Sequence, residues 1–283
     1  MKPKPRLGQH FLTESRAIER IVSALGNLAG QTVVEIGPGR GAITRELAGR
    51  AARVLAVELD QVLAAGLRDK FSPDRVTVIE QDILTFDFAA AFAEFCPGAS
   101  GAGRFHVVGN LPYYITSPIL LRLAASHAML DQALLMVQRE VADRILAQPG
   151  TRDFGLLSVT VRMYGDVERL FTLPPRAFSP PPEVHSTVFR WRFAPRFAEL
   201  GVDEVSFLRL ARVAFAQKRK TLVNNLRAAG ISHTLAADAL AAAGILPQVR
   251  AETLGLEAFA SLWRFLEREG ARFGGTPAHL SES

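Results

Sequence analysis

The chain has 283 residues, of which 33 are Lys or Arg, 28 are Asp or Glu and one is Cys, and its formal net charge is +5. At about 150 residues a domain, this length suggests one large domain, alone or with a smaller one, and 48% apolar residues are too many for a disordered chain. A single cysteine, Cys96, excludes a disulfide framework and a CxxC metal site, so we expect a cytoplasmic protein without a bound metal.

The sequence carries no pattern typical of secretion or membrane insertion. Residues Met1–Arg6 are charged and contain prolines, with no apolar run after them, so we expect no signal peptide. The longest uncharged stretch, Phe105–Leu121, is too short and too polar to span a membrane. A sequence pI of about 9.8 instead favours a polyanionic partner. We therefore expect a monomer that contacts a polyanion and no membrane.

Short apolar runs alternate with helical segments in the first half of the chain. Ahead of them, Thr13 is expected to cap an amphipathic helix with one apolar face, formed by Ile18, Ile21, Val22 and Leu25. The predicted strands are Thr32–Ile36, Arg53–Val57, Arg75–Ile79, Phe105–Val108 and Gln132–Val137, with helices at Gln61–Lys70 and Ser117–Ser126 among them. These runs are continuous rather than alternating, as in strands buried on both faces of a parallel sheet. The pattern predicts a mostly parallel, doubly wound α/β sheet.

The second half of the chain changes character. A helix after Arg139 should end at the break Pro149–Gly150, and two further strands are expected around Val167–Leu173 and Val184–Phe193. The proline cluster of residues 178–182 between these strands suits a fixed surface loop. From Val205 onward the composition is Ala, Leu and Arg without a strand-like run, which predicts a small all-α domain. We expect a large α/β domain at residues 1–200, a helical domain at 201–272 and a flexible tail at 273–283.

A glycine-rich turn follows the first predicted strand and opens a helix. Gly37 and Gly39 allow a tight turn and a close approach to a ligand, and the helix beyond presents unpaired N–H groups. Glu58 ends the next strand, where a carboxylate can accept two ribose hydroxyls. Because Gly37, Gly39 and Ala42 also satisfy the pattern GxGxxG/A, an NAD-dependent oxidoreductase is a competing interpretation. A third interpretation is a plain glycine turn that binds no ligand.

Two further sets of polar groups follow the third and fourth strands. Asp82 could accept from an exocyclic amine and the Ile83 N–H could donate to a ring nitrogen, which together describe an adenine edge. An Asp at this place could also cap a helix. At the carboxyl end of the fourth strand lies the tetrapeptide Asn110–Tyr113.

The tetrapeptide has the groups needed to activate an adenine amine. The N6 lone pair is delocalised into the ring, so the amine is a poor nucleophile until its protons are held by acceptors. The side-chain oxygen of Asn110 and the carbonyl of Leu111 could both accept from N6, with Pro112 fixing the backbone. Tyr113 offers a flat ring for the base, and stacking contributes about 1–3 kcal/mol per base. The expected catalytic residues are therefore Asn110, Leu111, Pro112 and Tyr113.

These motifs resemble those of the S-adenosylmethionine-dependent rRNA adenine dimethyltransferases, the KsgA-type family that also includes the macrolide-resistance methylases. The resemblance extends over nearly the whole chain and rests on Gly8–Leu12, Glu35–Gly39, Asp82, Asn110–Tyr113, Phe178–Val184, Gln217–Leu222 and Arg250–Glu252. It implies a Rossmann-like class I methyltransferase sheet with a C-terminal all-α domain. It also implies transfer of methyl groups from S-adenosylmethionine to N6 of two adjacent adenosines near the 3′ end of 16S rRNA, and a role in small-subunit biogenesis.

The resemblance assigns individual roles. The expected cofactor-binding residues are His10, Leu12, Gly37, Gly39, Glu58, Asp82, Ile83 and Asn110. The family often has Asn where this chain has His10, and the imidazole could simply pack at the start of the first helix. Phe178 corresponds to a second aromatic residue near the target base, although an aromatic residue before prolines is as often ordinary packing.

Basic residues of the helical region are the candidates for RNA binding. On a single helix through Phe207–Arg227, one arc would carry the cations and a neighbouring arc, with Leu208, Ala211, Phe215, Leu222 and Leu226, would be buried. The expected RNA-binding residues are Arg144, Arg209, Arg212, Lys218, Arg219, Lys220, Arg227 and Arg250, and Lys2, Lys4 and Arg6 could add to them. A basic helix face can also be merely solvated. A non-enzymatic assembly factor that binds immature small subunits is a further, compatible hypothesis.

Overall fold

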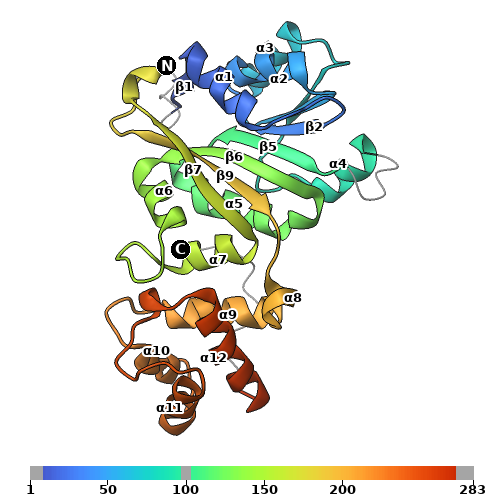
Figure 1. Ribbon diagram of the computed structural model, residues 1–283. Coiled ribbons are helices and arrows are strands. Elements are labelled where there is room, and N and C mark those ends of the chain that lie inside the picture. Colours follow the sequence, from blue (N-terminus) through green and yellow to red (C-terminus); the bar gives the residue numbers. More distant parts are fainter. Residues whose placement is uncertain (1–8, 97–102, 272–283) are drawn as a thin grey trace. The chain divides into compact units, whose positions relative to one another are not determined.

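The computed structural model describes residues 9–96 and 103–271 (Figure 1). The described residues form two compact units. The first takes the chain up to Ala142 together with Val167–Phe193, and the second takes Asp143–Asp166 and the chain from Ala194 onward. This division differs from the predicted boundary near residue 200, because residues 143–166 pack with the C-terminal helices. Lys2, Lys4, Arg6 and the predicted tail at 273–283 lie outside the described residues.

The first unit is built on a seven-stranded sheet in the order β4-β3-β2-β5-β6-β9-β7. Its strands are β2 (Thr32–Ile36), β3 (Arg53–Glu58), β4 (Val76–Glu80), β5 (Phe105–Asn110), β6 (Leu130–Gln138), β7 (Gly165–Leu173) and β9 (Ser186–Phe193). The pairs from β4 to β6 are parallel, and β9 pairs with β6 antiparallel. This arrangement confirms the predicted Rossmann-like class I methyltransferase sheet with a C-terminal helical region.

Helices connect the parallel strands and cover the sheet (Figure 1). They are α1 (Ser15–Ala24), α2 (Ala42–Arg50), α3 (Gln61–Lys70), α4 (Phe88–Phe95), α5 (Thr116–Ala125) and α6 (Arg139–Leu146). All five residues of β2 are buried, as expected for a strand covered on both faces. The parallel strands β3 and β5 lie on opposite sides of β2, so the strand order switches there and the carboxyl ends of the three strands open onto one crevice.

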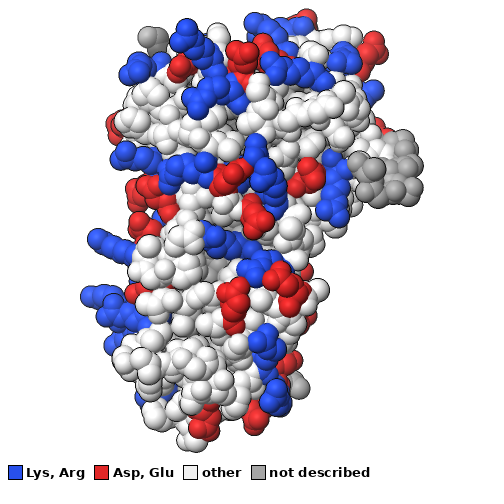
Figure 2. Space-filling model, viewed as in Figure 1, with Lys and Arg blue, Asp and Glu red and all other residues white. Residues whose placement is uncertain are grey.

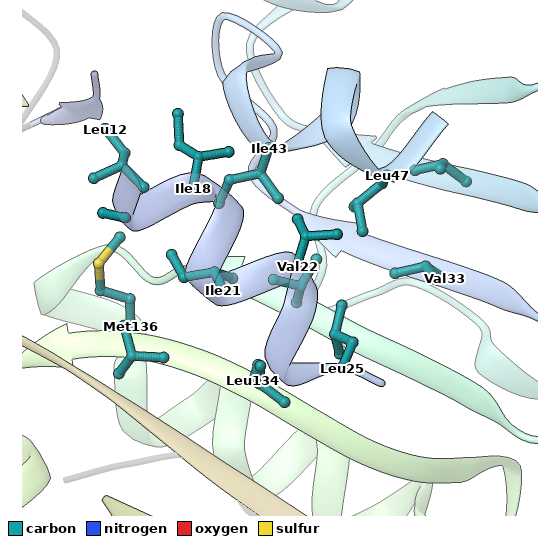
Figure 3. Packing of buried hydrophobic residues seen from close by; sticks show 14 of the residues in the cluster. Leu12, Ile18, Ile21, Val22, Leu25, Val33, Ile43, Leu47, Leu134 and Met136 are labelled. Atoms are coloured by element: carbon teal, nitrogen blue, oxygen red, sulfur yellow. The ribbon is translucent and has the colours of Figure 1, made fainter. Parts of the chain in front are cut away.

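The core on one face of the sheet is organised around α1. Ile18, Ile21 and Val22 are buried and lie between α2 and the sheet (Figure 3). From the sheet side they meet residues such as Val33 and Met136. Full burial of such a side chain contributes about 1.5–3 kcal/mol relative to exposure. This apolar stripe therefore holds α1, and the segment that precedes it, against the sheet.

The expected helix cap at Thr13 is wrong. The N-cap position of α1 is Glu14, and it makes no side-chain capping bond. Thr13 instead donates to the carbonyl of Ala177 from both its backbone N–H (2.9 Å) and its hydroxyl (3.2 Å). These bonds continue a short antiparallel pair that the sequence did not reveal, between β1 (Phe11–Leu12) and β8 (Phe178–Ser179). The proline cluster is thus tied to the N-terminal segment, with a cis Ser179–Pro180 peptide.

The second unit is helical in its described part. It contains α7 (Leu156–Met163), α8 (Phe197–Leu200), α9 (Glu204–Ala214), α10 (Leu222–Ala228), α11 (His233–Ala242) and α12 (Leu256–Arg268). Among the residues of both units that the structure describes, no helix is long and apolar enough to cross a membrane. Nor does any group of three or more potential metal ligands occur within residues 9–96 and 103–271.

The single helix predicted through Phe207–Arg227 is wrong. The chain leaves α9 after Ala214 and starts α10 at Leu222, with a turn between them. Thr221 caps α10 by accepting from the backbone of Asn224 at 3.4 Å. The side chain of Asn225 donates to the carbonyls of Ala214 (2.7 Å) and Gln217 (3.3 Å). These bonds give the carbonyls of Ala214 and Gln217 a donor where the helix ends, although the side-chain oxygen of Asn225 is buried without a hydrogen-bond partner among the described residues.

Candidate active site

A glycine turn joins β2 to α2 at the carboxyl edge of the sheet. Gly37 has a φ of 63°, a left-handed conformation that favours glycine, and a Cβ placed there would meet nothing within 4 Å. Gly39 has a φ of 58°, but its Cβ would lie 2.9 Å from the ring of Phe11. Gly37 therefore leaves open space above the turn, whereas Gly39 allows Phe11 to pack against the turn.

Glu58 fastens this turn to the end of β3. The residue is 5% exposed, and its carboxylate accepts from the backbone N–H of Gly39 at Oε2 and from that of Asp60 at Oε1, both at 3.0 Å. Each carboxylate oxygen has two acceptor sites, so both keep capacity for a further donor. Glu58 is thus held in one orientation and can still accept hydroxyl groups.

Glu35 lies beneath the turn and is 2% exposed. Thr44 donates its hydroxyl to Oε2 at 2.6 Å. Burial raises the pKa of Glu35 to about 7; the Thr44 bond opposes this rise, and the nearby Glu58 carboxylate adds to it. Near neutral pH, Glu35 is therefore protonated in a large part of the molecules, which lowers the negative charge on the floor of the site.

Asp82 and Ile83 lie in the turn after β4. The carbonyl of Glu58 accepts from the backbone of Gln81 at 3.0 Å, which joins this turn to the end of β3. Asp82 accepts from the backbone N–H of Leu84 at 2.9 Å. It does not cap a helix, because α4 begins at Phe88 and is capped by Asp87. The competing interpretation of Asp82 as a helix cap is therefore wrong.

Asn110 ends β5, and its amide is oriented by the N-terminal segment. Its Nδ2 donates to the backbone carbonyl of His10 at 2.9 Å, which leaves Oδ1 as the acceptor of the amide. The imidazole Nδ1 of His10 lies 2.8 Å from the carbonyl oxygen of Pro180. His10 therefore links two segments distant in sequence: its backbone carbonyl holds the amide at the end of β5, and its imidazole contacts the proline cluster.

The residues that follow Asn110 are held by backbone bonds. The N–H of Leu111 donates to Met136 at 2.9 Å, and its carbonyl accepts no hydrogen bond within the part of the chain that the structure describes. The carbonyl of Pro112 accepts from the N–H of Ile115 at 3.3 Å and from the hydroxyl of Thr116 at 3.2 Å. Tyr113 starts a short 3-10 turn, and its side chain lies outside what the structure describes.

One cleft of about 730 Å³ brings most of the predicted residues together. It is lined by all eight expected cofactor-binding residues, His10, Leu12, Gly37, Gly39, Glu58, Asp82, Ile83 and Asn110, and by Leu111 and Pro112. Phe178 is not among its lining residues. It is 4% exposed and belongs to the hydrophobic cluster around α1.

Sequence reasoning missed several residues of this cleft. Leu59 and Tyr114 line it with 61% and 63% of their surface exposed. Each directly follows a predicted site residue, and an exposed apolar side chain at such a place is the pattern that could have indicated them. Arg40, within the glycine turn, also lines the cleft.

The candidate RNA-binding residues lie on several elements rather than on one helix face. Arg209 and Arg212 are on α9, Arg227 is on α10 and Arg144 is on α6. The cations Lys218, Arg219 and Lys220 are exposed in the turn before α10. This turn is joined to the segment of Arg250, because Leu222 donates to the carbonyl of Val249 at 2.9 Å. Lys and Arg side chains are spread over the face seen in Figure 2, with acidic ones among them.

Comparisons with known proteins identify the family. The model of the family described as ribosomal RNA adenine dimethylase matches residues 1–268. The chain is 55% identical to a protein named ribosomal RNA small subunit methyltransferase A from Acidobacterium capsulatum, over 94% of this chain and 92% of that protein. It is 49% identical to the protein of that name from Koribacter versatilis, over 94% and 95% of the two chains.

Solved structures share the fold. A dimethyladenosine transferase from Plasmodium falciparum superposes with a TM-score of 0.77 over 94% of this chain and all of that one, at 22% identity. The 23S rRNA methyltransferase ErmE superposes with a TM-score of 0.66 over 91% and 99% of the two chains, at 26% identity. From the full-length family match and the closely similar relatives, the chain belongs to the ribosomal RNA adenine dimethylase family.

Proposed function

We propose that this protein methylates N6 of two adjacent adenosines near the 3′ end of 16S rRNA, in the course of small-subunit biogenesis. As a member of its family it is an S-adenosylmethionine-dependent rRNA adenine dimethyltransferase. The observation that carries the proposal is the Asn110 amide, held by the His10 carbonyl in the cleft that the glycine turn also lines. An NAD-dependent oxidoreductase would leave Asn110–Tyr113 without a role.

The residues of the cleft fit the cofactor that the family uses. A volume of about 730 Å³ is within the range of small-molecule sites. The open space above Gly37 admits a ligand, Glu58 can accept ribose hydroxyls, and Asp82 can accept from an adenine amine. When bound, the cofactor supplies an electrophilic methyl group. His10, Leu12, Gly39 and Ile83 would complete its binding site.

The protein's own contribution to the reaction is to position acceptors around the target amine. The Asn110 side-chain oxygen and the Leu111 carbonyl would accept hydrogen bonds from the two N6–H groups. These bonds would direct the nitrogen lone pair away from the ring. Both acceptors are fixed before substrate binds, through His10 and Met136, so little reorganisation is needed during the reaction. The displaced proton can leave to water, and no strong base is required. Tyr113 would stack on the extruded base.

The direct test is mass analysis of the RNA product. Small subunits that lack the modification are incubated with the protein and isotope-labelled S-adenosylmethionine. We expect two adjacent nucleotides near the 3′ end of the 16S rRNA to gain two labelled methyl groups each. RNA without label, or label on other nucleotides, would contradict the proposed function. Calorimetry provides a second check, since S-adenosylhomocysteine should bind and NAD should not.

Phosphate contacts elsewhere on the chain would position the RNA. The cations Lys218, Arg219 and Lys220 are exposed on one turn and have no carboxylate partner among the described residues. Arg250 is less available, because it lies 3.8 Å from Glu252. We infer that the turn of residues 218–220 contributes most, with Arg144, Arg209, Arg212 and Arg227 as further candidates.

Neutralising the 218–220 turn should weaken RNA binding in a salt-dependent way. For the triple alanine variant of Lys218, Arg219 and Lys220, we expect the slope of log K against log salt concentration to fall by about 2, since each phosphate contact contributes about 0.7–0.9. The double variant Arg50→Ala/Arg68→Ala removes cations already paired with Glu46 and Glu80 and should leave the slope unchanged. Equal slopes in the triple variant and the wild type would show that this turn contacts no phosphate.

A further inference from the structure

Arg40 has a defined position at the cleft although its side chain is exposed. It lies in a tight turn that is closed by a 2.9 Å bond from the Gly41 N–H to the Pro38 carbonyl. Its guanidinium carbon lies 4.5 Å from the centroid of the Phe11 ring, a geometry that contributes about 0.5–1 kcal/mol at exposed sites. Phe11 is fixed in turn by the β1–β8 pairing and by its packing on Gly39.

The cleft contains an imbalance of charge that Arg40 alone offsets. Its lining residues include the carboxylates of Glu58, Asp60 and Asp82 as well as Glu35, whose raised pKa of about 7 lowers its share of the negative charge, and Arg40 is the one Lys or Arg among the described lining residues. Glu58 and Asp60 accept from backbone amides, and Glu35 accepts from Thr44. No ion pair joins Arg40 to a carboxylate in the described part of the chain. Its donors are therefore available to a ligand.

The charges of the cofactor match this arrangement. The sulfonium and the ammonium group of S-adenosylmethionine are cationic and suit a cleft rich in carboxylates. Its carboxylate is the one group that these acids would repel, and a neighbouring cation would offset that repulsion. A guanidinium suits a carboxylate because two parallel N–H donors can engage both oxygens.

We propose that Arg40, held over the Phe11 ring, binds the carboxylate of the cofactor's amino-acid part. This assignment rests on the proposed use of S-adenosylmethionine and adds a residue that selects the intact cofactor over its nucleoside portion. Phe11, which also lines the cleft, orients the guanidinium through its ring.

Calorimetry with two ligands tests the assignment on the full chain. S-adenosylhomocysteine carries the amino-acid part, whereas 5′-methylthioadenosine has the same nucleoside and thioether sulfur without it. For Arg40→Gln we expect the Kd of S-adenosylhomocysteine to rise about tenfold, the loss of one charge-assisted contact, and the Kd of methylthioadenosine to stay unchanged. Phe11→Leu should give a smaller loss, again only for S-adenosylhomocysteine. Arg45→Gln, at an exposed Arg of α2 outside the cleft lining, is the matched control and should bind both ligands as the wild type does.

Three outcomes would overturn the proposal. Equal losses for both ligands would show a general disturbance of the glycine turn, and no loss for either would show that Arg40 does not contact the cofactor. An unchanged Kd for S-adenosylhomocysteine together with weaker RNA binding would assign Arg40 to a phosphate of the substrate. A wild-type chain that binds S-adenosylhomocysteine but methylates no adenosine would contradict the proposed function and leave the Arg40 comparison intact.

Discussion

A chain carrying Asn110→Ala is expected to bind S-adenosylhomocysteine with near wild-type affinity and to lose methyl transfer almost completely. Removing a preorganised group that acts on the reacting atoms typically lowers kcat on the order of 100- to 1000-fold. Cofactor binding should persist because Glu58, at the end of β3, and Asp82, after β4, are not changed in this variant. Single-turnover methylation of small subunits measures the rate of methyl transfer, and calorimetry measures the affinity for S-adenosylhomocysteine.

Two further variants separate the acceptor role of Asn110 from general damage. Asn110→Asp keeps an acceptor but replaces the amide donor, so a carboxylate would face the carbonyl of His10. We expect a loss of kcat comparable to that of the alanine variant. Asn224→Ala, at an exposed position in α10, should behave as the wild type. Near-normal turnover of Asn110→Ala would refute the assigned role.

The second large effect is expected at Gly109, immediately before Asn110. Gly109 lies between β2 and β6, opposite Ile36 and Leu135. A Cβ there would lie 3.0 Å from both the Cβ and the carbonyl oxygen of Ile36 and 3.1 Å from the Leu111 side chain. Backbone atoms in the centre of a sheet cannot move aside, so Gly109→Ala should destabilise the protein by about 1–3 kcal/mol. It should also reduce methyl transfer, because strand β5 must shift at Asn110.

Gly66→Ala is the matched control for this substitution. Gly66 lies within α3, where an added Cβ would meet nothing within 4 Å. Alanine in a helix interior is favoured over glycine by up to about 1 kcal/mol, so this variant should be as stable as the wild type or more so. Urea unfolding followed by circular dichroism compares the two. An unfolding midpoint for Gly109→Ala equal to that of the wild type would contradict the steric argument.

The strands and the grouping of site residues were readable from the sequence for a simple reason. Strand Thr32–Ile36 and helix Gln61–Lys70 were predicted with the bounds that the structure has, and the other parallel strands with small shifts at their ends. In a parallel sheet the carboxyl ends of all strands lie at the same edge. Residues at or just beyond the carboxyl ends of different strands, such as Glu58, Asp82 and Asn110, could therefore be expected in one cleft before any distance was known.

The predictions that were wrong depended on partners far away in the chain. Thr13 has the residue type and position of a helix cap, but Ala177 lies close enough to take its donors. The pattern of Phe207–Arg227 suits one helix, yet Asn225 reaches back to Ala214 and stabilises a break. The grouping of residues 143–166 with helices that follow much later in the sequence is a further contact that no local pattern indicates.

The sequence by itself determined the sheet, its glycine turn and the chemistry at its carboxyl edge, because these follow from local periodicity and from the types of residue at strand ends. Only the tertiary structure decided how that chemistry is oriented. It places the carbonyl of His10 against the amide of Asn110 and the ring of Phe11 under Arg40, and it puts Phe178 in the core. Each of these contacts joins segments that meet only after the chain has folded, through hydrogen bonds and packing that no local sequence pattern encodes.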